Sequence, residues 1–98
     1  MDEKDEKDAY RQKLEARLDQ WRAEIEKLQA KAVEASADAR IQYSEQIESL
    51  QDQQAEARRK LEEFDDASGE AWKDLRSGVE KAWNDLGEAV KRARERIG

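Results

Sequence analysis

The sequence contains neither cysteine nor histidine. Without cysteine the chain can form no disulfide bond and offers no thiolate, and without either residue the common zinc sites are excluded. The absence of histidine removes the usual general base, so the serines have no partner for a hydrolase triad. No GxxxxGK phosphate-binding loop occurs either. We therefore expect a protein that is not an enzyme and that uses no cofactor and no metal.

Proline is also absent, and glycine occurs only four times in 98 residues. The residues that dominate instead, Ala, Glu, Lys, Arg, Gln and Leu, are the ones that helix interiors favour. Charged residues make up 45% of the chain and hydrophobic residues 37%, and the hydrophobic ones recur periodically. This composition predicts a single all-α domain.

Long apolar runs are missing as well. No stretch approaches the roughly 20 residues that a membrane span needs. The first eight residues, MDEKDEKD, are acidic and lack the apolar centre of a secretory signal. We assign residues 1–8 to an acidic N-terminal segment and residues 9–98 to one helical coiled-coil domain, and we expect a cytoplasmic location.

The net charge of −6 is unevenly distributed. Residues 1–69 hold 19 acidic and 12 basic residues, whereas residues 70–98 hold 6 acidic and 7 basic ones. A small basic cluster ends the chain, where positive charge favours the last turn of a helix. Nucleic-acid binding needs a dense basic face, so we expect no nucleic acid as partner.

A heptad seam begins at Leu14, because apolar residues then alternate in steps of four and three. Its strongest members are Leu14, Leu18, Trp21, Ile25 and Leu28. After Ala39 the steps become four and four, through Tyr43 to Ile47, which is a stutter. It coincides with the weakest helix formers of this region, at residues 36–38. A stutter needs no chain break, and neither Gly nor Pro occurs there. We favour one continuous helix over about residues 9–65, with a break at 36–38 as the alternative.

Residues 66–69 carry the clearest turn signal, because Gly69 follows Asp and Ser residues that can cap a helix. After the turn, an eleven-residue repeat (AWKDLRSGVEK, then AWNDLGEAVKR) predicts a second helix over about residues 70–97. Gly78 and Gly87 inside it each cost about 1 kcal/mol relative to Ala, and a close approach by a neighbouring helix would explain them. The expected intramolecular packing anchors are Phe64, Trp72, Leu75, Val79, Trp83, Leu86 and Val90.

The two predicted helices differ in length, about 84 Å against 42 Å. We expect an antiparallel helical hairpin in which the short helix covers only residues 43–64 of the long one. The seam from Leu14 to Leu28 would stay bare and pair with a second copy, giving a homodimer. The alternative, a chain break at 36–38, gives a monomeric three-helix bundle.

The three tryptophans allow a second interpretation. Trp21, Trp72 and Trp83 at seam positions are typical of core anchors. An eleven-residue apolar stripe with Trp also occurs on helices that lie on lipid, although here acids balance the bases of residues 71–92. The alternative to a self-associating structural protein is therefore a peripheral protein that binds a lipid surface through its C-terminal helix.

The heptads of YRQKLEARLDQWRAEIEKLQAKA, the central ARIQYSEQIESLQ and the paired AWxDL motifs resemble a family of small bacterial coiled-coil proteins described as stress-response proteins. The likeness covers nearly the whole chain. It implies a cytoplasmic helical protein associated with stress conditions, and it supplies no catalytic residues.

Overall fold

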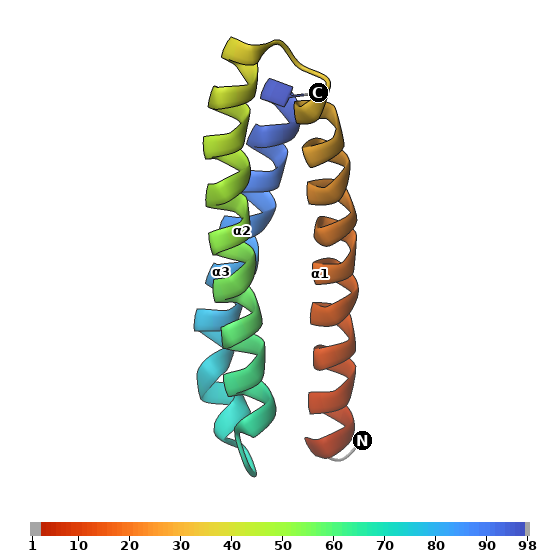
Figure 1. Cartoon of the computed structure of the whole chain (residues 1–98). Coiled ribbons are helices and arrows are strands. Elements are labelled where there is room, and N and C mark those ends of the chain that lie inside the picture. Colours follow the sequence, from red (N-terminus) through yellow and green to blue (C-terminus); the bar gives the residue numbers. More distant parts are fainter. Residues whose placement is uncertain (1–2, 98) are drawn as a thin grey trace.

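The computed structural model describes residues 3–97, which form three α-helices. Helix α1 spans Glu3–Val33, α2 spans Ala37–Asp66 and α3 spans Ala71–Ile97. The helices run up, down and up along a bundle of 53 × 17 × 17 Å (Figure 1). The predicted all-α fold is confirmed. Helix α1 already includes residues 3–8 of the acidic segment, while Met1 and Asp2 lie outside the described residues.

The predicted hairpin of one long and one short helix is not what the structure shows. The helices contain 31, 30 and 27 residues, so they are similar in length. Residues 34–36 interrupt the helix that was expected to run from residue 9 to residue 65. The alternative, a three-helix bundle, describes the chain.

A helix cap at Ser36 separates α1 from α2. Ser36 is extended (φ −60°, ψ 161°), and its hydroxyl accepts a hydrogen bond from the Ala39 amide at 3.4 Å. Arg40 fixes the other side of the turn, since its guanidinium donates to the Val33 carbonyl at 2.9 Å and to the Ala35 carbonyl at 3.3 Å. Capping of this kind offsets the loss of helical hydrogen bonds at the break. Because the turn uses neither Gly nor Pro, the sequence lacked the usual signal of a helix break, and we predicted a continuous helix.

The turn between α2 and α3 is different in kind. Gly69 has φ +60°, in the left-handed region that side chains avoid, and no other described residue has a positive φ. Before it, the Ala67 amide donates to the Phe64 carbonyl at 3.3 Å. In this left-handed conformation Gly69 cannot continue an α-helix, and glycine is the residue type that adopts the conformation most readily.

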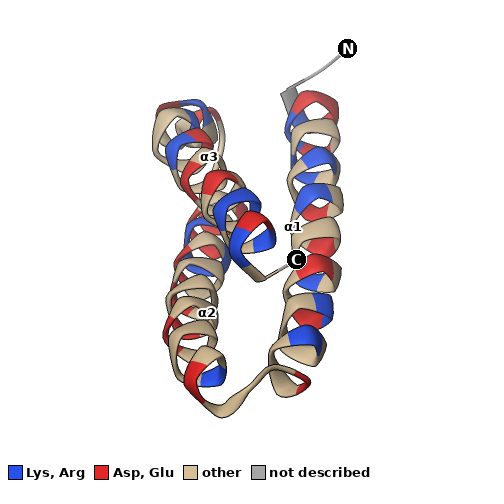
Figure 2. Ribbon diagram, turned by 90° about the horizontal axis from the view of Figure 1, so that it is seen from above, with Lys and Arg blue, Asp and Glu red and all other residues tan. Residues whose placement is uncertain are grey.

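The core lies along the axis between the three helices. Its buried apolar residues come from every helix, and α2 and α3 share the most extensive contact. Basic and acidic residues are interspersed along all three helices (Figure 2). Many of them form pairs within one helix, such as Lys81 with Asp85 at 3.5 Å, and exposed pairs of this kind stabilise a helix only slightly.

Candidate interaction surfaces

The residues predicted to form a self-association seam lie in the core of the single chain. Leu14, Leu18, Ile25 and Leu28 are between 1% and 9% exposed. They belong to the same buried cluster as residues of α2 and α3. The premise of a bare seam therefore does not hold, because the break at residues 34–36 gives α3 a partner on α1 as well as on α2.

Trp21, the centre of that seam, is half-buried and packs against α3. Its indole lies over Gly87, where a Cβ atom would come within 2.9 Å of Trp21 Cζ2. The Arg17 guanidinium covers the other part of the ring, 4.8 Å from its centroid. The close approach predicted for a glycine of this helix occurs at Gly87, whereas nothing lies within 4 Å of a Cβ at Gly78.

The predicted intramolecular anchors lie mostly in the interior. Phe64, Trp72, Val79, Trp83, Leu86 and Val90 are at most 2% exposed, and Leu75 is half-buried. Trp83 links α3 to α1, since its Nε1 donates a hydrogen bond to the Leu14 carbonyl at 3.1 Å. Helix α3 thus contacts both other helices, and its tryptophan face points to the core.

An aromatic cluster closes the bundle near the α2–α3 turn. The ring centroids of Tyr10 and Phe64 are 5.6 Å apart, and those of Phe64 and Trp72 are 5.7 Å apart in an edge-on arrangement. Trp72 Nε1 is buried and has no hydrogen-bond partner among the described residues. The cluster joins all three helices through apolar contact that sequence spacing did not reveal for Tyr10.

Tyr10 also makes a polar contact across the bundle. Its hydroxyl donates to the Glu80 carboxylate at 3.0 Å. Burial, followed by the hydrogen bond and the negative charge of Glu80, raises the pKa of Tyr10 to about 12.

Two cations near the start of α1 bind the far end of α2. Arg11 makes a two-point contact with the Asp65 carboxylate, with Nε at 2.5 Å and a terminal nitrogen at 3.0 Å. Lys7 Nζ donates to the Ala67 carbonyl at 2.7 Å and the Asp65 carbonyl at 3.3 Å. These contacts fix the register of α1 on the hairpin of α2 and α3.

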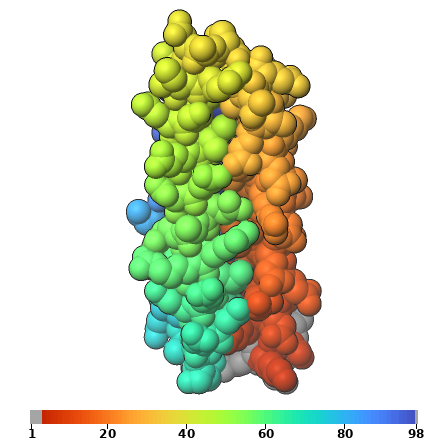
Figure 3. All heavy atoms as spheres, viewed as in Figure 1, coloured from red at the N-terminus to blue at the C-terminus, as the bar shows by residue number. Residues whose placement is uncertain are grey.

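The exposed apolar surface lies at the other end of the bundle. Among the described residues, the large hydrophobic side chains that stand out in solvent are Val33, 67% exposed, and Ile41, 65% exposed. Val33 also lines a groove of about 620 Å³ between α1 and α2, where Ala32 and Ile47 lie among polar and charged side chains such as those of Arg40 and Glu48. The surface of α1 and α2 faces the viewer in Figure 3, with this end at the top in yellow.

Val33 and Ile41 were not predicted as functional residues. Neither belongs to the heptad seam, which runs through Ala32 and Ala39 instead. The available signal was two branched aliphatic residues, both outside the seam, on either side of the weakest helical stretch.

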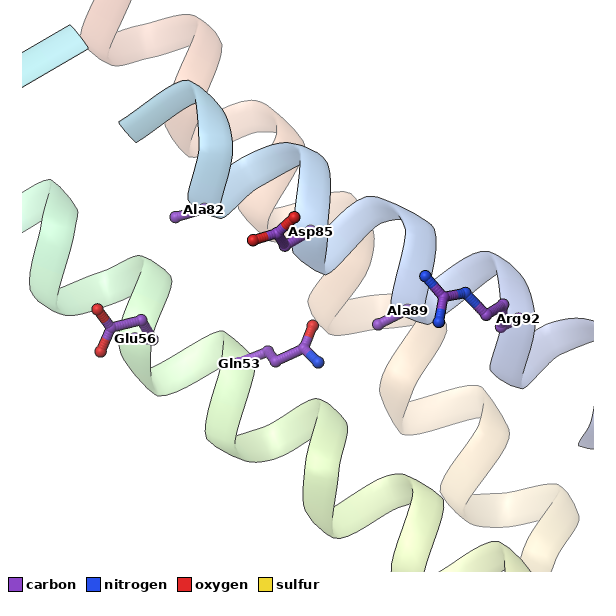
Figure 4. Close-up of a pocket in the computed structure, with 6 residues that line it drawn as sticks. All are labelled: Gln53, Glu56, Ala82, Asp85, Ala89 and Arg92. Atoms are coloured by element: carbon purple, nitrogen blue, oxygen red, sulfur yellow. The ribbon is translucent and has the colours of Figure 1, made fainter. Parts of the chain in front are cut away.

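A second groove lies between α2 and α3 (Figure 4). It has a volume of about 320 Å³ and is lined by Gln53, Glu56, Ala82, Asp85, Ala89 and Arg92. Gln53 Oε1 is buried without a hydrogen-bond partner among the described residues. Both charge signs and two alanines line this groove, so it presents no single chemistry that would select a ligand.

Within residues 3–97, no three carboxylates lie together as a metal site would need, and no helix has the length and apolarity required to cross a bilayer. Comparison of the chain with models of known families, with curated proteins and with solved structures gives no match. The function of the chain is therefore inferred from the surfaces described above.

Proposed function

We propose that this chain is a non-enzymatic helical interaction protein that associates with a second copy of itself. The observation that carries the proposal is the exposure of Val33 and Ile41 beside the α1–α2 turn. Exposing apolar side chains of this size to water is unfavourable, and burying them against a matching surface on another copy would be favourable.

The resemblance to bacterial stress-response proteins adds a biological setting to the proposal. In that setting the protein acts in the cytoplasm by assembly, under stress conditions. An increase in its level after heat or osmotic stress, measured by immunoblot, would support this setting, and a constant level under both would contradict it.

The test of self-association is the molar mass in solution. We expect the wild-type chain to shift from monomer to dimer between micromolar and millimolar concentration in light scattering after gel filtration. Replacing both exposed residues, Val33→Ser with Ile41→Ser, should weaken the dimer at least about tenfold, because it removes apolar area. Serine has a helix propensity close to that of Val and Ile, so the helices should persist.

The matched control carries two serines elsewhere on the surface. Ala16 and Ala55 are exposed on α1 and α2, and Ala16→Ser with Ala55→Ser should leave the dimer unchanged. A wild-type chain that stays monomeric over the whole concentration range would show the proposal to be wrong.

The lipid-surface alternative would require the bundle to open. Trp72 and Trp83 on α3 are at most 2% exposed, so the apolar stripe of α3 is occupied by its neighbours in the closed bundle. Flotation with anionic vesicles at low salt distinguishes the alternatives: co-migration of the protein would favour a lipid partner for α3.

A further inference from the structure

We propose that two copies associate by exchanging α1: the α1–α2 turn straightens, and α1 of each copy packs against α2 and α3 of the other. The inference rests on the proposed self-association and adds the segment and the mechanism by which it occurs. Four observations support it: two concern the α1–α2 turn, one the surface that receives α1, and one the exposed apolar pair.

The α1–α2 turn contains no residue that a helix excludes. Glu34 and Ala35 continue α1 in tighter form, with their amides donating to the carbonyls of Lys31 and Ala32 at 3.2 Å each. Ser36 already has the φ of a helix, −60°, and departs from it only in ψ. Straightening the other turn would require Gly69 to move from φ +60° to the helical region and would place a glycine inside a helix, at a cost of about 1 kcal/mol relative to Ala. The α1–α2 turn is therefore the easier of the two to straighten.

The contacts that hold this turn are few and exposed. They are the Ser36 cap, at 3.4 Å, and the bonds from Arg40 to the carbonyls of Val33 and Ala35, all of them in solvent. A straight helix would replace these bonds by ordinary helical ones at residues that favour helix. Opening the turn therefore costs little hydrogen-bonding free energy.

The surface of α2 and α3 that would receive α1 of another copy is complementary to it, because it already packs against α1 of the same chain. Trp83 bonds the Leu14 carbonyl, and Gly87 provides the space for Trp21. The same contacts form whether α1 comes from the same chain or from another one, while α2 and α3 remain joined to each other. The core of the exchanged dimer is thus the core of the monomer.

The exposed apolar pair lies where the two exchanged chains would cross. Val33 and Ile41 stand four residues before and four residues after Ala37. In two straight helices that cross antiparallel at Ala37, Val33 of one copy is level with Ile41 of the other. Exchange therefore gives a partner to the two large aliphatic residues that the monomer leaves in water.

The first experiment uses Ala37→Pro, at the first position of α2. Proline fits the bundle there, because the first amide of a helix needs no partner and because Ser36 already has the extended conformation that precedes proline. In a straight helix the same proline would break a hydrogen bond and clash with the preceding turn. We expect Ala37→Pro to weaken the dimer at least about a hundredfold, and Ser36→Ala to strengthen it about tenfold by removing the cap.

The second experiment detects exchange directly. Arg11→Asp and Asp65→Arg each place like charges together within one chain. When the two variants are unfolded and refolded together, exchange restores both opposite-charge pairs, but only in the mixed dimer. Native mass spectrometry should show an excess of mixed dimer of about tenfold over the statistical amount. The control mixture, Arg59→Asp with Glu56→Arg, alters a pair within α2 and should stay statistical.

The outcomes separate the two proposals. A wild-type chain that remains monomeric after refolding at millimolar concentration overturns self-association and exchange together. A dimer that Ala37→Pro leaves unchanged, with a statistical mixture of Arg11→Asp and Asp65→Arg, overturns exchange alone and indicates that intact bundles dock side by side.

Discussion

At the scale of single residues, two tryptophans of the eleven-residue repeat differ in chemistry although both are buried. Trp83 Nε1 donates to the Leu14 carbonyl at 3.1 Å, and Trp72 Nε1 has no partner among the described residues. A buried polar group without a partner costs about 1–3 kcal/mol. Repetition in the sequence therefore did not produce repetition in hydrogen bonding.

Replacing each tryptophan by phenylalanine should expose this difference. Trp83→Phe loses a hydrogen bond and some volume, and we expect it to reduce the free energy of unfolding by about 2–3 kcal/mol. Trp72→Phe loses similar volume but also removes the unpaired N–H, so the expected cost is below about 1 kcal/mol. Urea unfolding followed by circular dichroism measures both, and equal costs would contradict this account.

Tyr10 should make the stability depend on alkaline pH. Its pKa rises to about 12 in the folded chain, mainly through burial and then through Glu80, against 10.0 for the free side chain. The folded chain therefore keeps a proton that the unfolded chain has released. The resulting stability is complete below pH 10 and is lost as the pH rises from 10 towards 12.

The titration is best followed in a Tyr43→Phe background, where tyrosinate absorbance reports Tyr10 alone. We expect a midpoint near 12 there, and a lower midpoint after Glu80→Gln, which removes the negative charge. A midpoint at the value of free tyrosine would show that the Tyr10 contact does not persist in solution.

At the scale of the elements, the two mid-helix glycines of α3 face different surroundings. A Cβ at Gly87 would meet Trp21 at 2.9 Å, whereas a Cβ at Gly78 would meet nothing within 4 Å. Sequence reasoning offered one explanation, close helix approach, for both. The packing of α1 supports it at Gly87 only, and the structure offers no account of Gly78.

Alanine substitutions test this contrast within one helix. Gly78→Ala should stabilise the bundle by about 0.5–1 kcal/mol through helix propensity alone. Gly87→Ala gains the same amount but displaces the Trp21 ring, so we expect a net loss of about 1 kcal/mol. Thermal unfolding of the two variants provides the measurement, and stabilisation by both would mean that Trp21 does not rest on Gly87.

At the scale of the whole molecule, the core differs between its two ends. Near the α2–α3 turn it contains the rings of Tyr10, Phe64 and Trp72. Near the α1–α2 turn the buried residues are smaller, with Ala32 and Ala93 among them. Less apolar area is therefore removed from water at the end where the exchange of α1 would begin.

Hydrogen exchange should follow this difference. We expect amides of residues 28–33 and 90–96 to exchange at least about tenfold faster than those of residues 60–64 and 79–83, because local opening needs less apolar exposure there. Mass spectrometry after proteolysis resolves these segments. Uniform protection along the bundle would contradict an opening that starts at the α1–α2 end.

The sequence by itself determined that the chain is helical, and it placed one of the two turns. The absence of proline and the heptad and eleven-residue periods favour helix, and Gly69 after the Asp and Ser residues of 65–68 favours a turn after α2, because these are properties of local backbone conformation. Periodicity also identified the apolar face of each helix. Trp83 lies in the core as predicted, whereas Leu14 and Leu28, expected to be buried against a second copy, are buried within the single chain.

Only the tertiary structure decided where α1 packs. Residues 34–36 are compatible with both a helix and a capped turn, so the free-energy difference between these two local conformations is small. It is outweighed by the favourable free energy of the apolar area that α1 buries on α2 and α3. That packing covers the seam predicted to be bare and leaves Val33 and Ile41 in solvent. The same balance, a weak local preference against a large buried surface, is what would allow a second chain to supply α1.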